Sequence, residues 1–83
     1  MLFLAEFYLP AGAALSDIVQ QVRMGAAAAR ADGAQARFIQ VVFVPAEETC
    51  FALFEAATAA AVSAAGSAAG LEFDRIAPAL LSR

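Results

Sequence analysis

The chain has no histidine, lysine or tryptophan, and it contains one cysteine. The absence of imidazole excludes a serine triad and removes the usual base for a nucleophilic thiol. The single thiol, Cys50, cannot form an internal disulfide. Five arginines are scattered along the chain against eight acidic residues, so the clustered basic patch that nucleic acids require is missing. We therefore expect no nucleic-acid partner.

No hydrophobic run is long enough for a membrane span. The uncharged stretch 56–71 is short and consists mainly of alanine, which is only weakly apolar. The first ten residues, MLFLAEFYLP, have no basic start and place Glu6 inside the apolar run, so they do not resemble a signal peptide. These features predict a cytoplasmic protein that does not bind a membrane.

The chain is instead rich in alanine and phenylalanine. Apolar residues make up 63% of the sequence, above the roughly 45–50% of ordinary globular proteins. Alanine supplies much of this share and buries little area, but seven phenylalanines are many large rings for 83 residues. An apolar surplus that one small domain cannot bury favours a partner surface, most often that of a second copy.

The order of strand and helix signals predicts one domain over residues 1–83. Aromatic and β-branched runs alternate with two alanine-rich segments of helical character, and Pro or Gly residues separate them. The predicted elements are strand Leu2–Leu9, helix Ser16–Asp32, strand Arg37–Val44, strand Glu48–Glu55, helix Thr58–Gly70 and strand Glu72–Ala77. This βαββαβ order is typical of the ferredoxin-like α+β fold, in which two helices cover one face of a four-stranded antiparallel sheet.

The two helices carry start and stop signals. Ser16 is the predicted N-cap of the first helix, and Gly33 suits the left-handed position that ends it. Thr58 is the predicted N-cap of the second helix. The apolar stripe of the first helix consists of Ile18, Val22, Ala26 and Ala29.

The predicted fold leaves the other face of the sheet open, and strict alternation makes neither face of the first two strands clearly polar. The alternating sets are Phe3, Ala5, Phe7 and Leu9 against Leu2, Leu4, Glu6 and Tyr8, and then Phe38, Gln40, Val42 and Val44 against Ile39, Val41 and Phe43. An apolar open face with few polar groups suits the packing of one sheet on another. We therefore predict a homodimer that forms through the open sheet face.

Three segments together resemble one protein family. They are LAEFYLP, similar to its opening strand, RFIQVVFVPAEETCFALFEA, similar to its second and third strands with their Cys, and AAAVSAAGSAAGLEFDRI, similar to its last helix and strand. The family is an uncharacterised-domain group of small bacterial proteins, one of which is described as nickel-binding. The resemblance implies a ferredoxin-like domain, commonly dimeric, with metal binding in at least one member.

The resemblance thus implies nickel as a cofactor, and Glu6 and Cys50 match positions of the family pattern. Members often place a His after the Ala-Val pair of the last helix, whereas this chain has the residues 65–67, Ala-Gly-Ser, there. Nickel prefers nitrogen donors, so the metal role does not transfer intact. Glu, Asp, Cys, Gln and backbone groups remain as donors, and Glu6 and Cys50 are the metal-ligand candidates among them. The alternative for Cys50 is a small hydrophobic residue buried in a strand.

Four polar side chains within apolar strands are the candidate ligand-binding residues: Glu6, Tyr8, Gln40 and Arg75. On a shared face they would form the small polar cluster in apolar surroundings that is typical of a ligand site. Two interpretations of Glu6 stay open, since it either forms a structural ion pair with Arg75 or projects into a pocket as a base or ligand. A hydrogen-bonded cluster at a dimer interface is the alternative for the whole set.

Three functions compete on these grounds. The first is a small dimeric binding protein with a sheet-lined pocket. The second is an interaction or assembly partner that docks its alanine-rich helix on another protein. The third is a cofactor-independent oxygenase or isomerase on a dimeric α+β barrel, in which Glu6 is the base and Tyr8 or Arg75 stabilises developing negative charge. The scarcity of reactive side chains favours a role that is not enzymatic.

Overall fold

The computed structural model describes residues 1–82 and has the predicted βαββαβ order. Its elements are β1 (Leu2–Tyr8), α1 (Leu15–Ala31), β2 (Ala36–Val44), a 3-10 helix (Pro45–Glu47), β3 (Thr49–Ala56), α2 (Ala59–Ala68) and β4 (Arg75–Ala79). Arg83, the last residue of the predicted domain, lies outside the described residues. Between residues 1 and 82, no helix is long and apolar enough to cross a membrane.

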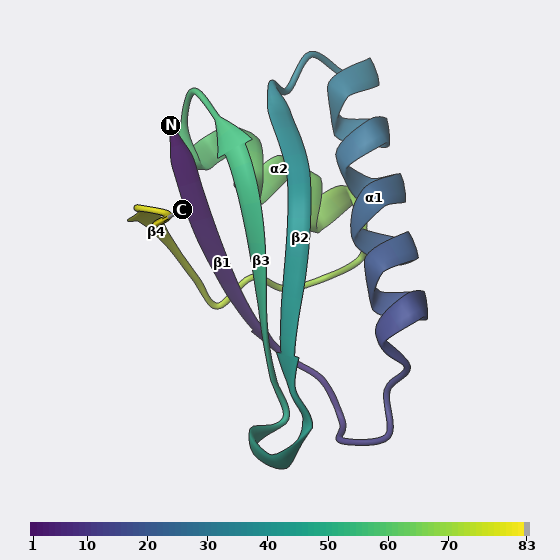
Figure 1. Ribbon diagram of the computed structural model, residues 1–83. Coiled ribbons are helices and arrows are strands. Elements are labelled where there is room, and N and C mark those ends of the chain that lie inside the picture. Colours follow the sequence, from purple (N-terminus) through teal and green to yellow (C-terminus); the bar gives the residue numbers. More distant parts are fainter. Residues whose placement is uncertain (83) are drawn as a thin grey trace.

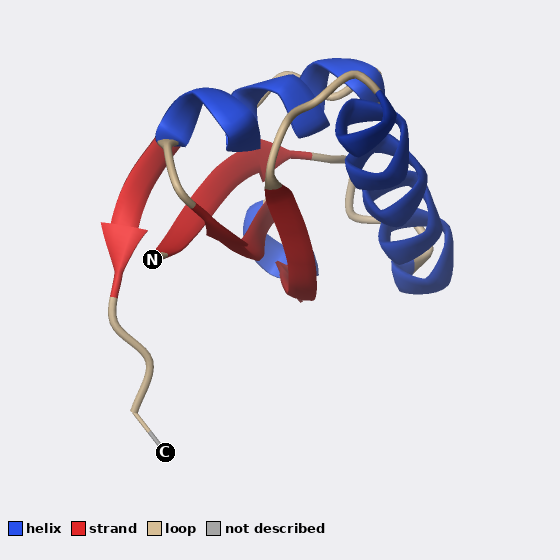
Figure 2. Cartoon of the chain, turned by 90° about the horizontal axis from the view of Figure 1, so that it is seen from above, coloured by secondary structure: helices blue, strands red, loops and turns tan. Residues whose placement is uncertain are grey.

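The four strands form one antiparallel sheet with the order β2-β3-β1-β4 (Figure 1). β1 and β3 therefore occupy the centre of the sheet, while β2 and β4 form its edges. Figure 2 shows α1 and α2 on the same side of the sheet. The ferredoxin-like α+β fold predicted from the sequence is confirmed.

The core lies between the sheet and the two helices. Alternate residues of the central strands point into it, because successive side chains of a strand face opposite sides. The buried residues of β1 and β3 include Phe3, Ala5, Phe7, Cys50, Ala52 and Phe54. The predicted stripe of α1 is buried against the sheet, and it consists of Ile18, Val22, Ala26 and Ala29. The same alternation turns the other residues of β1 and β3 to the open face.

Two of the three predicted helix signals are confirmed. The Thr58 hydroxyl accepts a hydrogen bond from the Ala61 N–H at 3.2 Å, and Gly33 has a positive φ of 96° after α1. Ser16 was the wrong N-cap, because α1 begins at Leu15 with Ala14 in the cap position. Ser16 lies within the first helical turn. The side chain that caps the unpaired N–H groups of that turn belongs to the residue that precedes the helix.

A bulge in β2 corrects the predicted alternation of that strand. Phe38 pairs with Phe54, and the pairing resumes at Gln40, which leaves Ile39 as an extra residue. Strict alternation placed Phe38 on the same face as Gln40 and Val42. In the structure Phe38 faces the core, with its ring centroid 5.8 Å from that of Phe54, while Gln40 and Val42 face the open side.

The last strand is β4, Arg75–Ala79, and the predicted range Glu72–Ala77 was wrong at both ends. Phe73 packs against Phe7 at a ring-centroid distance of 5.3 Å, so the chain before Arg75 turns toward the core instead of joining the sheet. Pro78 lies within the strand rather than after it. Because β4 is an edge strand, a residue without an N–H is tolerated there.

Candidate functional site

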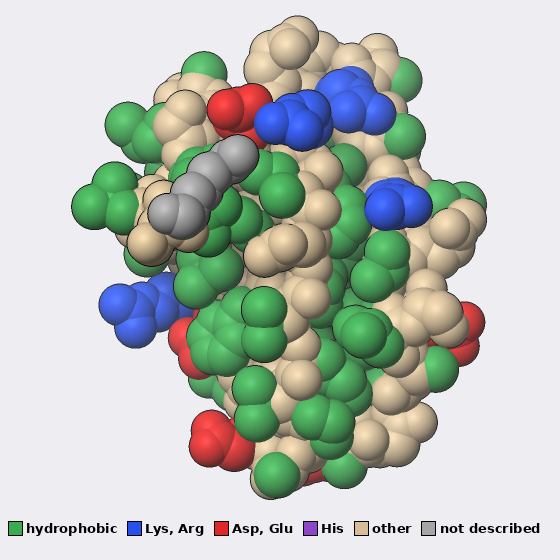
Figure 3. Space-filling model, viewed as in Figure 1, with side chains coloured by type: hydrophobic (Ala, Val, Ile, Leu, Met, Phe, Trp, Pro, Cys, Tyr) green, Lys and Arg blue, Asp and Glu red, His purple; other side chains and the backbone are tan. Residues whose placement is uncertain are grey.

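The open face of the sheet is largely apolar. By strand register it includes Leu2, Leu4, Glu6, Tyr8, Gln40, Val42, Phe51, Leu53, Arg75, Ala77 and Ala79. Figure 3 views this face and shows hydrophobic side chains grouped over the strands, with charged side chains mostly around them. Val42 is 52% exposed and Tyr8 is 57% exposed. In a sheet with one face in water, every second residue of a strand is normally polar and points to that face. The open face here is mostly apolar, so it has the composition of a contact surface.

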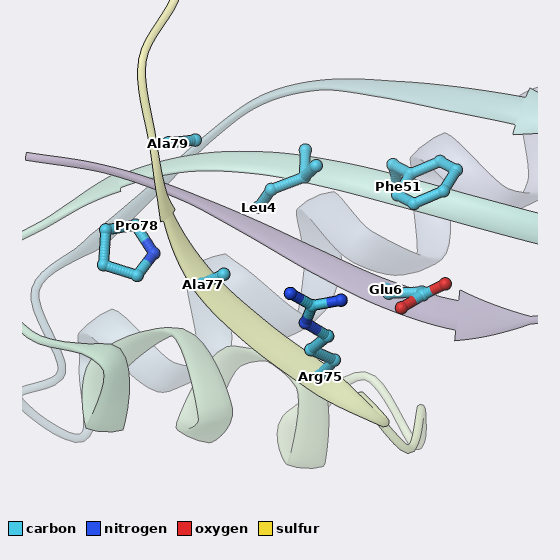
Figure 4. Close-up of a pocket in the computed structure, with 7 residues that line it drawn as sticks. All are labelled: Leu4, Glu6, Phe51, Arg75, Ala77, Pro78 and Ala79. Carbon is cyan, nitrogen blue, oxygen red and sulfur yellow. The ribbon is translucent and has the colours of Figure 1, made fainter.

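A pocket of about 190 Å³ lies on the open face (Figure 4). Its lining residues are Leu4, Glu6, Phe51, Arg75, Ala77, Pro78 and Ala79. The hollow forms because small residues of β4 stand opposite leucines of β1, with Ala77 beside Leu4 and Ala79 beside Leu2. Glu6 and Arg75 are the charged residues of an otherwise apolar lining.

Two of the four predicted ligand-binding residues, Glu6 and Arg75, line this pocket, and a third, Tyr8, contacts Glu6 without lining it. Glu6 and Arg75 are direct cross-strand partners on β1 and β4, and such partners have Cβ atoms about 4.5–5.5 Å apart. The Glu6 Oε2 atom accepts a hydrogen bond from the Tyr8 hydroxyl at 3.2 Å. The alternative in which Glu6 forms an ion pair with Arg75 is not seen, since within residues 1–82 the ion pair that forms joins Arg37 to Glu55.

The contact with Glu6 changes the acidity of Tyr8. The negative charge of Glu6, and then the hydrogen bond to it, raise the pKa of the Tyr8 hydroxyl above its ordinary value of 10.0. Tyr8 is therefore a neutral hydrogen-bond donor at physiological pH, and its proton is directed at Glu6. This geometry fits a role in orienting the Glu6 carboxylate.

Gln40 lies apart from the other three residues. It shares the open face with them, but it pairs with Leu53 on β3, and Leu53 in turn pairs with Leu4 on β1. Two strands therefore separate Gln40 from Arg75, and Gln40 does not line the pocket. The predicted four-residue cluster is reduced to Glu6, Tyr8 and Arg75.

An ion pair occupies another part of the open face. The Arg37 Nη2 atom lies 2.9 Å from the Glu55 Oε1 atom, and both side chains are more than half exposed. The hydrogen bond from Arg37, and then its charge, lower the pKa of Glu55. Because Arg37 has a carboxylate partner and does not line the pocket, it is a matched control for Arg75.

The two predicted metal ligands cannot act together within one chain. Glu6 faces the open side of the sheet, whereas Cys50 pairs with Phe7 and is fully buried on the side of the helices. Across the described part of the chain, no group of three or more His, Cys, Asp or Glu residues is close enough to hold a metal ion. The donor set therefore does not fit the nickel that the family resemblance implies.

We predict that the Cys50 thiol is unreactive in the folded protein. Burial raises its pKa, so the neutral thiol contributes stability that is fully present below the pKa of an unfolded thiol, about 8.5, and is lost as the pH rises through the folded value. Alkylation by iodoacetamide near pH 8 should be at least about 100-fold slower in the native than in the urea-unfolded protein. Equal rates in the two states would contradict a buried structural role.

The apolar half of the pocket was not predicted from the sequence. Phe51 forms part of the lining and pairs directly with Glu6 across β1 and β3. The signal that could have found it is the alternation of β3, where Cys50, Ala52 and Phe54 face the core and leave Phe51 on the other side. Pro78 was missed because it was expected to follow the last strand.

The fold and site define a ferredoxin-like α+β domain with an apolar open sheet face and one charged pocket on it. The chain is similar to the crystal structure of SCO4226 from Streptomyces coelicolor A3(2), with 28% sequence identity, a TM-score of 0.79 and full coverage of both chains. No protein-family model and no curated protein sequence matches the chain.

Proposed function

We propose that this chain is a small dimeric binding protein, in which two copies pack their open sheet faces together around the pocket. The observation that carries this proposal is the apolar open face with its pocket of about 190 Å³. Burial of apolar area is the main driving force of association, and in a C2 dimer the same face serves both partners. The dimer that the family resemblance implies agrees with this geometry.

The segment after β4 supports the same arrangement. Figure 2 shows it leaving the sheet on the side opposite α1 and α2. Leu80 is completely exposed and Leu81 is 47% exposed, so the segment adds apolar surface on the side where a second copy would lie. Exposed leucines gathered beside an apolar face are typical of an interface.

The two alternative functions have less support. The buried face of α2, which includes Val62, Ala65 and Gly66, already packs within its own domain, and this leaves less of that helix for another protein. A cofactor-independent enzyme would need Tyr8 or Arg75 to stabilise an oxyanion. The Tyr8 hydroxyl donates its proton to Glu6 and not toward the pocket, so Tyr8 is poorly placed for that role. The cytoplasmic location expected from the sequence stays a prediction.

A charge introduced on the open face by substitution is expected to separate the two copies. Val42 lies on that face outside the pocket, and Val42→Glu should convert a dimer into a monomer because the carboxylate would be buried without a partner. The matched control is Met24→Glu, since Met24 is 63% exposed on α1. Light scattering after gel filtration, over about a hundredfold range of concentration, measures the mass of each protein.

Two results would contradict the dimer. One is a wild-type protein that stays monomeric over the whole range of concentration. The other is a loss of the dimer in Met24→Glu together with its retention in Val42→Glu, which would move the interface from the sheet to the helices.

A further inference from the structure

We infer that the pocket binds a small monocarboxylate with an apolar body about the size of one aromatic ring, and that Arg75 binds the carboxylate. This inference rests on the proposed binding function and names the class of its ligand. The carrying observation is the Arg75 guanidinium, which borders a small apolar hollow and forms no ion pair with a carboxylate of residues 1–82.

Arg75 provides the recognition group. It lines the pocket (Figure 4), and within residues 1–82 its side chain takes part in no hydrogen bond or ion pair with the rest of the chain. The nearest acid in the register, Glu6, accepts its hydrogen bond from Tyr8 instead. A planar guanidinium binds a carboxylate through two parallel hydrogen bonds, so the chemistry of Arg75 fits a ligand that brings its own carboxylate.

The charge balance of the pocket favours a single negative charge on the ligand. Arg75 and Glu6 stand opposite each other on neighbouring strands, so an anion bound at Arg75 lies within a few ångströms of the Glu6 carboxylate. Because Glu6 offsets part of the attraction to Arg75, the net attraction grows only in proportion to the ligand charge, whereas the cost of removing that charge from water rises with its square, which disfavours a dianion such as a phosphate monoester. A ligand with one carboxylate and no other charge is repelled least by the Glu6 carboxylate.

The walls and the volume of the pocket define the uncharged part of the ligand. Leu4, Phe51, Ala77 and Pro78 offer carbon surfaces without hydrogen-bonding side chains. A cavity of roughly 150 Å³ with apolar walls accommodates benzene, and this pocket measures about 190 Å³. One ring or a short branched alkyl chain therefore fills it, and the Phe51 ring provides a surface for stacking at about 0.5–1.5 kcal/mol beyond the area buried.

The experiment is a calorimetric titration of the full chain with benzoate, benzamide and benzylamine. These probes share the ring and differ in the charge of the head group. We expect benzoate to bind at least about 10-fold more tightly than the other two, which is the usual advantage of a hydrogen bond to a charged group. NMR shifts of the Leu4, Ala77 and Ala79 amides on addition of benzoate would place the ligand in the pocket.

Variants at the two charged residues should act in opposite directions. Arg75→Gln should weaken benzoate binding by about 10-fold or more, whereas Glu6→Gln should strengthen it by a few-fold because the repulsion is removed. The matched control is Arg37→Gln, which removes an arginine of the same sheet face that is already paired with Glu55. That variant should bind benzoate like the wild type.

Several outcomes would overturn the inference. If benzamide or benzylamine binds at the pocket as tightly as benzoate, or if Arg75→Gln binds benzoate like the wild type, the carboxylate is not recognised by Arg75. In that case the proposed binding function stands and only the ligand class is wrong. If none of the three probes binds, the inference fails, and the masses measured for the wild type and the Val42→Glu variant then decide separately whether the dimer exists.

Discussion

Gly25→Ala is expected to destabilise the domain by about 3 kcal/mol, although alanine is the better helix former. Gly25 is buried on α1 where this helix crosses α2, and a Cβ atom added to it would lie 2.6 Å from the Ala65 carbonyl oxygen and 2.7 Å from the Ala69 nitrogen. Both atoms belong to the backbone and cannot rotate away, so the helices would have to move apart. For a domain of this size, with a total stability of about 4–12 kcal/mol, that loss is a large fraction.

The sign of the Gly25→Ala result distinguishes helix packing from helix propensity. By propensity alone, Gly→Ala inside a helix stabilises by about 1 kcal/mol, so a raised midpoint of urea unfolding would contradict the close approach of α1 and α2. Gly12→Ala is the control, because a Cβ added at Gly12 meets nothing within 4 Å. Its free energy of unfolding should remain within about 0.5 kcal/mol of that of the wild type.

The need for glycine at position 25 shows where sequence reasoning ends. The apolar stripe of α1 was predictable, because apolar residues such as Ile18 and Val22 recur with the helical period of 3.6 residues. The distance between two helices cannot be derived from the sequence of either helix, since it depends on how both pack on the sheet. Without that distance, Gly25 resembled any other glycine in a helix, and only the structure reveals its neighbours.

The limits of the strand predictions have a related cause. β1 and β3 were predicted well because each crosses the centre of the sheet with an uninterrupted period of two residues. The bulge at Ile39 adds one residue without changing the local composition, so alternation assigned Phe38 to the wrong face. β4 begins only at Arg75, because Phe73 is held by core rings from distant parts of the chain.

The candidate site was predicted in its charges but not in its shape. Glu6 and Arg75 stand out in the sequence because a charge inside an apolar strand needs a reason, and the order of the strands brings these two residues together. Whether they form an ion pair depends on side-chain geometry that the sequence does not contain. The pocket itself exists because Ala77 lies opposite Leu4, which is a matter of register between two strands far apart in the chain.

Two phenylalanines three positions apart on β3 should respond differently to truncation. Phe54 is fully buried in the core and packs against the rings of Phe38 and Phe73, at centroid distances of 5.8 and 6.0 Å. Phe54→Ala should lower the free energy of unfolding by about 3–5 kcal/mol, through lost burial and the cavity left behind. Phe51 is only half-buried on the open face, and Phe51→Ala should cost the single chain about 1–2 kcal/mol.

The difference between the two variants becomes sharper when the protein concentration is varied. If the open face is the dimer interface, Phe51→Ala weakens the dimer as well as the pocket, so its unfolding midpoint should approach that of the wild type as the solution is diluted into the monomer range. The deficit of Phe54→Ala should persist at every concentration, because the ring is buried within one chain. Urea unfolding at several concentrations, followed by circular dichroism, measures both. A Phe51→Ala deficit as large as that of Phe54→Ala and independent of concentration would mean that Phe51 supports the fold of one chain, and the open face would then lose its assignment as an interface.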